Sequence, residues 1–278
     1  MKSWKLVPKN DLVLKYVECY WFLEKEAHDS SHTNPKLNPD PSAHLILADN
    51  HHIHEYNQEV TSHLVQGDHW IFPHLKTFTM DHSSHFKILG IKFRVGALYS
   101  LNLSDFSASL DNVVEANIRQ LLGEEQSGVE VLSIDAAYQS NEVRNILDEV
   151  LETWFSTTHE DKHSTLVRQI LPLLNHTPIA DIGNILHRSQ RTLERSFLKV
   201  TQLTMKQCQS MIRLESILDY LYQRRDNDIN WADVASKWNF SDQPHFIRFL
   251  KGAIDSTPAE YDKSRDLTID IYGNFEFN

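Results

Sequence analysis

The chain has 278 residues, of which 41% are hydrophobic, and this length and composition favour two domains that each bury their own core. Its two cysteines, Cys19 and Cys208, exclude a disulfide framework, and its formal net charge of -11 argues against a uniformly basic nucleic-acid binder. No apolar run approaches the ~20 residues of a membrane span, and charges interrupt the N-terminal residues where a signal peptide is apolar, so we expect a cytoplasmic protein without a membrane partner.

The charge is unevenly distributed along the chain. Residues 1–162 hold 13 basic and 24 acidic residues, whereas residues 163–278 hold 14 of each. Within the second part, residues 188–213 contain six Lys and Arg residues and one Glu. A nearly single-signed stretch is typical of a surface that faces phosphate, because solvated helix faces usually mix both signs.

The first hundred residues predict a sheet. Aromatic and β-branched residues separated by polar turns indicate short strands at 16–23, 44–47, 64–72 and 86–93. We expect a mostly antiparallel, barrel-like arrangement of these strands.

Helical spacing begins near residue 104. The clearest case is 143–155, where apolar residues recur at three- and four-residue steps after Asn141, a candidate N-cap. This helix packs on its own sheet or pairs with its twin in a homodimer, and the sequence leaves both alternatives open. The polar residues 156–162 indicate a domain boundary, which gives domains at 1–160 and 163–265.

The second domain predicts two similar helical pairs. The segments 179–200 and 231–251 each contain an apolar helix, a tight turn and a polar second helix, which is the helix-turn-helix pattern. Thr177, Ser189 and Asn230 are candidate N-caps. A longer helix over about 205–223 connects the two pairs.

In such a unit the second helix enters the major groove, so its inward face is apolar and its outward face forms hydrogen bonds. Leu193 and Phe197 are four residues apart in the first unit, and Phe246 and Leu250 are four apart in the second. We therefore take these as buried anchors. The candidate DNA-contacting residues are Ser189, Gln190, Arg191, Glu194, Arg195, Gln243, His245 and Arg248.

These residues carry a resemblance to the AraC/XylS family of transcription regulators over 165–262. SQRTLERSFLK (189–199) is similar to the family's S-x-R-x-L-x-R-x-F-K pattern, MIRLESILDYL resembles its connecting helix, and INWADVASKWNFSDQPHFIRFLKGAIDSTPAEYD resembles its signature segment. The resemblance implies a two-domain α+β fold, with an all-α C-terminal domain that binds double-stranded DNA. By the same resemblance, the base- or phosphate-contacting positions are Arg191, Glu194, Arg195, Gln243 and Arg248.

Three turns depart from the family, because Gln202, Asn239 and Asp255 replace its usual glycines. Asn and Asp tolerate a left-handed backbone better than other residues. Gln202 is less suited to it, so we expect the first unit to end differently.

The N-terminal part, about 1–155, resembles a sensory domain of this family through LVLKYVECYW, NPDPSAHLIL and ILGIKFRVGALYSL. The resemblance implies a β-rich domain that senses a small-molecule effector or dimerises, with no cofactor, and RNA polymerase as a further candidate partner. An effector pocket inside this domain would be lined by aromatic residues, for which the candidates are Trp21, Phe22, Trp70, Phe72 and Phe93.

A histidine-rich segment provides the alternative hypothesis, a metal-binding cupin-like enzyme or sensor fused to a helical domain. His52 and His54 alternate on a predicted strand and so point to one face. The segment lacks nearby cysteines and an H-E-x-x-H helix, and the chain lacks a phosphate-binding glycine loop and a G-x-S-x-G elbow. We therefore predict no catalytic or metal site. The eight histidines of this segment are His51, His52, His54, His63, His69, His74, His82 and His85.

Overall fold

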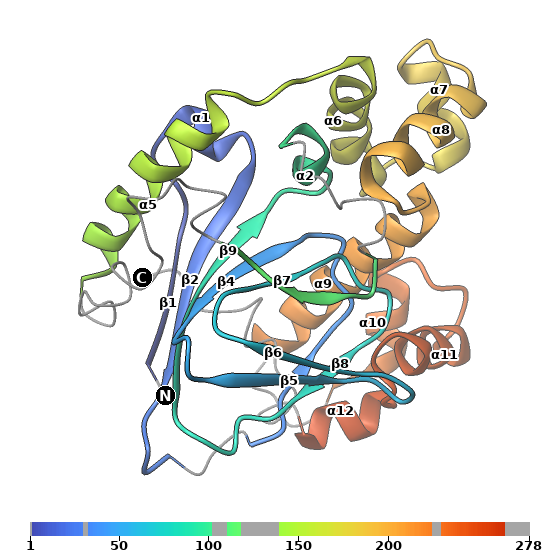
Figure 1. Ribbon diagram of the computed structural model, residues 1–278. Helices are drawn as coiled ribbons and strands as arrows, with labels where there is room; N and C mark the ends of the chain where they lie inside the picture. The colour runs from blue at the N-terminus through green and yellow to red at the C-terminus, as the bar shows by residue number, and fades with distance from the viewer. Residues whose placement is uncertain (1, 30–32, 102–109, 118–138, 224–228, 265–278) are drawn as a thin grey trace.

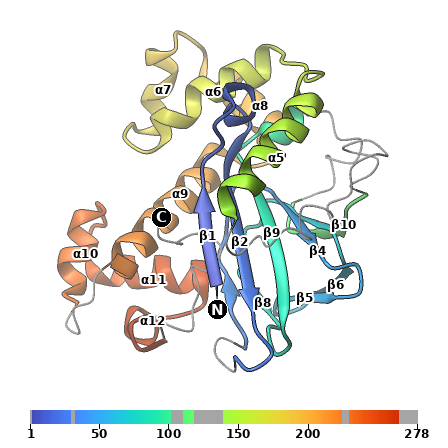
Figure 2. The ribbon, with the colours of Figure 1, turned by 90° about the vertical axis from the view of Figure 1, so that its left-hand side faces the viewer.

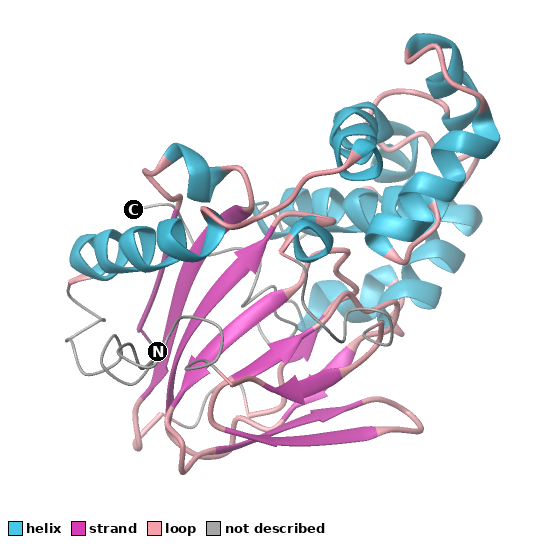
Figure 3. Ribbon diagram, turned by 45° about the horizontal axis from the view of Figure 1, so that its top comes forward, coloured by secondary structure: helices cyan, strands magenta, loops and turns pink. Residues whose placement is uncertain are grey.

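The computed structural model describes residues 2–29, 33–101, 110–117, 139–223 and 229–264. Two antiparallel sheets form the N-terminal part, and the helices of the C-terminal part line one side of it (Figure 1). In Figure 3 the strands gather on one side and these helices on the other. The expected α+β class with a β-rich N-terminal domain and an all-α C-terminal domain is confirmed.

The two sheets are open and face each other across a shared core, an arrangement compatible with the expected barrel-like domain. The larger sheet contains, in spatial order, β1 (Lys2–Leu6), β2 (Val17–Lys25), β9 (Phe86–Phe93), β4 (His44–Ala48), β7 (His69–Ile71) and β10 (Val113–Glu115). The smaller sheet contains β3 (Lys36–Leu37), β8 (Phe78–Met80), β5 (Ile53–Asn57) and β6 (Ser62–Gln66).

Three of the four predicted strands correspond to single strands, β2, β4 and β9. The fourth, 64–72, is divided between β6 and β7, which belong to different sheets. The chain turns between them at Gly67, whose φ of 67° lies in the left-handed region that glycine adopts at little cost. The apolar run thus predicted the strands but not the break.

Two apolar cores occupy the two faces of the larger sheet. One core lies between the sheets and includes Trp21, Ile88 and Phe78. The other lies on the opposite face under the helices α1 (Asp11–Leu14), α2 (Ala97–Ser100) and α5 (Ser140–Phe155). Alternate residues of β2 therefore enter different cores, as the two-residue period of a strand requires.

Helix α5 lies along the larger sheet beside β1, β2 and β9 (Figure 2). Its apolar stripe, which includes Val143, Leu147 and Leu151, is buried in the core beneath it. Of the two roles that the sequence left open, this placement supports packing on its own domain. The prediction that Asn141 caps this helix was wrong. Gln139 is the N-cap residue, and the Asn141 side chain accepts a hydrogen bond from Arg144.

The C-terminal domain consists of helices that follow one another closely. Their bounds are α6 (Lys162–Leu174), α7 (Ile179–Ile185), α8 (Gln190–Thr201), α9 (Met205–Gln223), α10 (Trp231–Lys237), α11 (Gln243–Ile254) and α12 (Pro258–Ser264). The predicted connector and both helix pairs are confirmed. The Thr177 cap was wrong by one residue, because Pro178 occupies the N-cap of α7. Among the described residues, none of the helices is long and apolar enough to cross a membrane.

Gly90, in the middle of β9, permits the close approach of a buried ring. A Cβ at this position would lie 1.9 Å from Cε2 of Trp21, which has 0% exposed surface. We expect Gly90→Ala to lower the free energy of unfolding by about 1–3 kcal/mol, because the ring or the strand must move. Urea unfolding of the single variant, and of the same change in a Trp21→Leu background, measures this. An equal cost in both backgrounds would exclude the steric explanation.

Candidate nucleic-acid interface

The first helix pair, α7 and α8, is built around two buried side chains. Leu193 and Phe197 lie on one face of α8 with 0% exposed surface and pack with Ile182 of α7. Ser189 is the N-cap of α8, and its Oγ accepts a hydrogen bond from the backbone N–H of Thr192. The anchors and the cap predicted from the sequence are confirmed.

The second pair, α10 and α11, repeats this construction. Phe246 and Leu250 are fully buried on one face of α11 and pack with Val234 of α10. Asn230 caps α10 as predicted, and Asp242 caps α11 by accepting from the backbone N–H of His245. The four-residue spacing of the anchors fixes which face of each second helix is left for solvent.

The structure leaves all but one of the candidate contact residues exposed, and Gln190 is half-buried. They come from the first two turns of α8 and α11 and from the residue before α8. The exposed residues are Ser189, Arg191, Glu194, Arg195, Gln243, His245 and Arg248. Each helix thus presents polar and cationic groups from its N-terminal half.

Several of these side chains already have partners. Gln190 Nε2 donates to Glu194 Oε1 at 2.9 Å, which orients the carboxylate. His245 Nδ1 lies 3.1 Å from the Ser241 hydroxyl, and its ring contacts Phe240. Glu194 is therefore held in place as a hydrogen-bond acceptor, the property by which a carboxylate recognises a cytosine amino group.

Two residues of the basic stretch do not belong to this surface. The Arg213 guanidinium lies 3.7 Å from the centre of the Phe240 ring and donates to the Trp238 backbone oxygen, so it stabilises the second unit. Lys199 lies 3.8 Å from a carboxylate oxygen of Asp161 and over the Tyr99 ring. The charge run alone could not separate these structural roles from exposed cations such as Arg195.

The three turns that lack the family's glycines all adopt the left-handed conformation. The φ angles of Gln202, Asn239 and Asp255 are 60°, 54° and 49°. Gln202 ends α8 by donating its backbone N–H to the carbonyl of Leu198. The expectation that the first unit ends differently was wrong, because the hydrogen bond is made in spite of the side chain.

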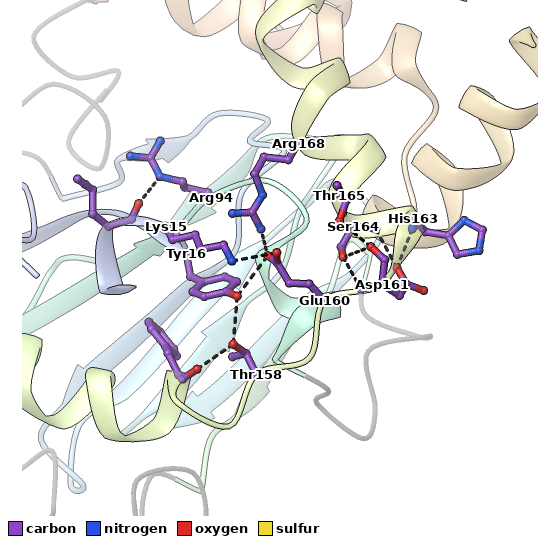
Figure 4. Close-up of polar contacts among 12 residues, drawn as sticks. Lys15, Tyr16, Arg94, Thr158, Glu160, Asp161, His163, Ser164, Thr165 and Arg168 are labelled. Atoms are coloured by element: carbon purple, nitrogen blue, oxygen red, sulfur yellow. Dashed lines mark hydrogen bonds and ion pairs between the residues drawn. The ribbon is translucent and has the colours of Figure 1, made fainter. Parts of the chain in front are cut away.

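The segment between α5 and α6 is held by both domains (Figure 4). The Tyr16 hydroxyl lies 3.0 Å from Thr158 Oγ1 and 3.2 Å from Glu160 Oε1. Glu160 forms ion pairs with Lys15 of the N-terminal domain and Arg168 of α6. The polar side chains of 156–162, which indicated a domain boundary, therefore form specific contacts. These contacts connect the end of α5 to the start of α6.

The five aromatic residues proposed for an effector pocket are buried, and they are divided between the two cores of the N-terminal domain. Phe22, Trp70, Phe72 and Phe93 belong to the core beneath α5, whereas Trp21 faces the core between the sheets. A cavity of about 530 Å³ lies elsewhere, between the smaller sheet and the end of α11, and none of the five lines it.

The histidine-rich segment forms ring contacts. The His54 ring lies 4.5 Å from the His52 ring and 4.9 Å from the His69 ring, measured between centroids. His69 Nε2 lies 2.7 Å from the Tyr56 hydroxyl. In the part of the chain that the structure describes, no group of three or more His, Cys, Asp or Glu side chains could hold a metal ion.

Two sequence families match the chain. A helix-turn-helix domain family (HTH_18) matches residues 182–264, and a domain of unknown function (DUF6597) matches residues 5–115. No curated protein sequence matches.

Several solved structures are similar to the chain at low identity. ToxT from Vibrio cholerae bound to (E)-4-(8-methylnaphthalen-1-yl)but-3-enoic acid is 13% identical, with a TM-score of 0.47, and the match covers 89% of this chain and 99% of that one. Unsaturated fatty acid-bound ToxT from strain SCE256 is 11% identical, with a TM-score of 0.43, covering 94% and 93%. The AraC-like transcriptional activator CuxR is 10% identical, with a TM-score of 0.27, covering 77% and 86%.

Proposed function

We propose that the chain is a transcription regulator of the AraC/XylS type and that each protomer binds DNA by placing α8 and α11 in two successive segments of the major groove. One observation carries the proposal. Both helices bury an apolar pair four residues apart and expose arginine at the same place, two residues after the first anchor: Arg195 follows Leu193, and Arg248 follows Phe246. A helical bundle that only bound protein would not require this correspondence.

Footprinting tests this arrangement. Duplexes selected by the full chain from a random-sequence pool should show two protected clusters per protomer on one face, about 10 base pairs apart. Their affinity should fall steeply with salt, because neutralised phosphates release counterions. Clusters on opposite faces would contradict the geometry, and a pool from which nothing is selected would contradict the function.

We further propose that the N-terminal domain controls DNA binding in response to a small molecule. Its contacts with α8, through Gly96 and Val200, and with α11, through Thr77 and Ala253, support this, since a change in the N-terminal domain would be transmitted to the DNA-binding domain. The buried aromatic residues such as Trp70 and Phe93 would then have to move apart to admit a ligand. Mapping of bound genomic sites with and without suspected small molecules tests this.

A further inference from the structure

One buried cation joins the two domains. The Lys92 side chain on β9 is 2% exposed, and its Nζ lies 2.9 Å from Glu215 Oε1, 3.2 Å from Asp40 Oδ2 and 3.5 Å from Glu18 Oε1. Glu18 and Asp40 belong to the N-terminal domain, whereas Glu215 lies on the connecting helix α9. Lys92 is therefore the shared partner of carboxylates from both domains.

The charges within this cluster make it sensitive to the loss of a partner. Burial by itself lowers the pKa of Lys92. The carboxylates of Asp40, Glu215 and Glu18 raise it by a larger amount, so the pKa lies well above its usual value and the ammonium stays charged. A buried cation without a carboxylate is strongly unfavourable, which is why removal of one partner of such a pair is costly. Asp40 is itself oriented by His44, whose Nε2 lies 3.1 Å from its Oδ2.

Glu215 lies where the two helix pairs meet. Residues of α9 up to Met211 pack in the core of the first unit, and those from Leu214 onward, such as Leu218, pack in the core of the second. The contact with Lys92 therefore holds α9 between the two units, at the place where a change in its position would affect both.

The N-terminal domain also holds the C-terminal ends of both second helices. Thr77 Oγ1 donates to the Ala253 carbonyl at 3.1 Å, and Lys36 Nζ lies 3.5 Å from the Ile254 carbonyl. A cation at this place is stabilised by the negative C-terminal end of the α11 dipole. At the end of α8, Gly96 packs so closely on Val200 that a Cβ would lie 2.8 Å from its Cγ1. The N-terminal halves of both helices stay exposed.

From these contacts we propose that Lys92 is a positioning residue for DNA recognition, which holds Glu215 of α9 so that the N-terminal domain sets the relative orientation of α8 and α11. The inference rests on the proposed function for its consequence in DNA binding, but its geometric part stands without it. The N-terminal domain does not cover the exposed N-terminal halves of α8 and α11. It therefore affects DNA recognition by setting the distance and the angle between these two helices.

Glu215→Gln is the informative variant. It keeps the size of the side chain and leaves Lys92 with Asp40 and Glu18, so the N-terminal domain retains its paired cation. Lys92→Met removes the ammonium that the three carboxylates share, and it serves as a second variant if the protein still folds. Glu26→Gln is the matched control, because Glu26 pairs with Lys2 on the surface, within one domain.

A distance between spin labels on the two units measures their orientation in the full chain. Asn184→Cys on α7 and Ala232→Cys on α10 introduce exposed thiols. Burial raises the pKa of both native thiols, Cys19 and Cys208, to about 12, so the labels react with the introduced ones. We expect Glu215→Gln to broaden or shift the distance distribution and Glu26→Gln to leave it unchanged. An unchanged distribution in Glu215→Gln would overturn the proposal.

Spacing of the DNA sites supplies a second measurement. On duplexes selected by the full chain, one base pair inserted between the protected clusters rotates them by about 35°. We expect this insertion to weaken binding by the parent chain about tenfold, and binding by Glu215→Gln by a clearly smaller factor. Equal factors would overturn the positioning role. Failure to select any duplex would contradict the proposed function, while the label distances would still decide the geometric part.

Discussion

Replacing Arg195 or Arg248 with alanine is expected to weaken specific DNA binding by about 1–3 kcal/mol each, which is about 5- to 150-fold. Both side chains are exposed, and each follows a buried anchor, Leu193 or Phe246, by two residues. Their removal should therefore leave the apolar cores intact while it removes a guanidinium that faces the groove. Binding curves for selected and scrambled duplexes at two salt concentrations measure the effect.

The same measurements separate two kinds of contact. A bidentate contact with guanine predicts that the preference for one base position relaxes, whereas a contact with phosphate predicts a uniform loss and a salt slope that falls by about one. Lys251→Ala is the control. Lys251 is an exposed cation one turn after Arg248, but it lines the cavity beside the N-terminal domain. Folded Arg195→Ala and Arg248→Ala variants that bind selected duplexes normally would refute these assignments.

The helix pairs were predictable because their signals are local. The anchors Leu193 and Phe197 lie one helical turn apart, and the cap Ser189 lies directly before α8, so a short window contains the information. The same reasoning failed at Asn141. Its side chain turns to Arg144 inside the helix, and capping residues are also common in first turns.

Strands β3, β5 and β8 of the smaller sheet were missed, and β6 was predicted only from Leu64, because large apolar residues of this sheet face outward. In β5, Ile53 is 60% exposed, while His54 and Tyr56 are buried. In β6, Leu64 is 66% exposed beside the buried Val65. Alternation predicts a strand's inner face only when that face is apolar, and in β5 the rings of His54 and Tyr56 occupy it.

The contacts between the domains could not be derived from spacing, since they join residues far apart in the chain. One signal was nevertheless present. Lys92 stands between Ile91 and Phe93 in a strand whose only other charged residue is Lys87, and lysine is almost never fully buried without a partner. The sequence thus indicated that a carboxylate must meet this strand, but not that Glu215 supplies it.

The buried histidines predict a fold that loses stability in mild acid. Burial, together with the neighbouring His69, lowers the pKa of His54 to about 2, and burial lowers that of His69 to about 4. In the unfolded chain both have a pKa of about 6.5. Between these values the unfolded state binds protons that the folded state does not, so the free energy of unfolding falls as the pH falls below 6.5. Asp68 acts in the opposite direction, because burial raises its pKa to about 6.

Comparison with His54→Leu isolates the contribution of His54 to the pH dependence of the unfolding free energy. His54 is 7% exposed, and within the described residues its Nε2 has no hydrogen-bond partner, so an apolar side chain should be tolerated. From pH 7.0 to 4.5 we expect the parent chain to lose about 3 kcal/mol of unfolding free energy relative to the variant, since one proton per molecule is linked to unfolding over about two pH units below 6.5. Urea unfolding at both pH values measures this, with His28→Leu, at an exposed histidine, as the control. If the parent and His54→Leu lose the same amount between these pH values, His54 is not a buried neutral histidine in the folded protein, and the acid sensitivity has another origin.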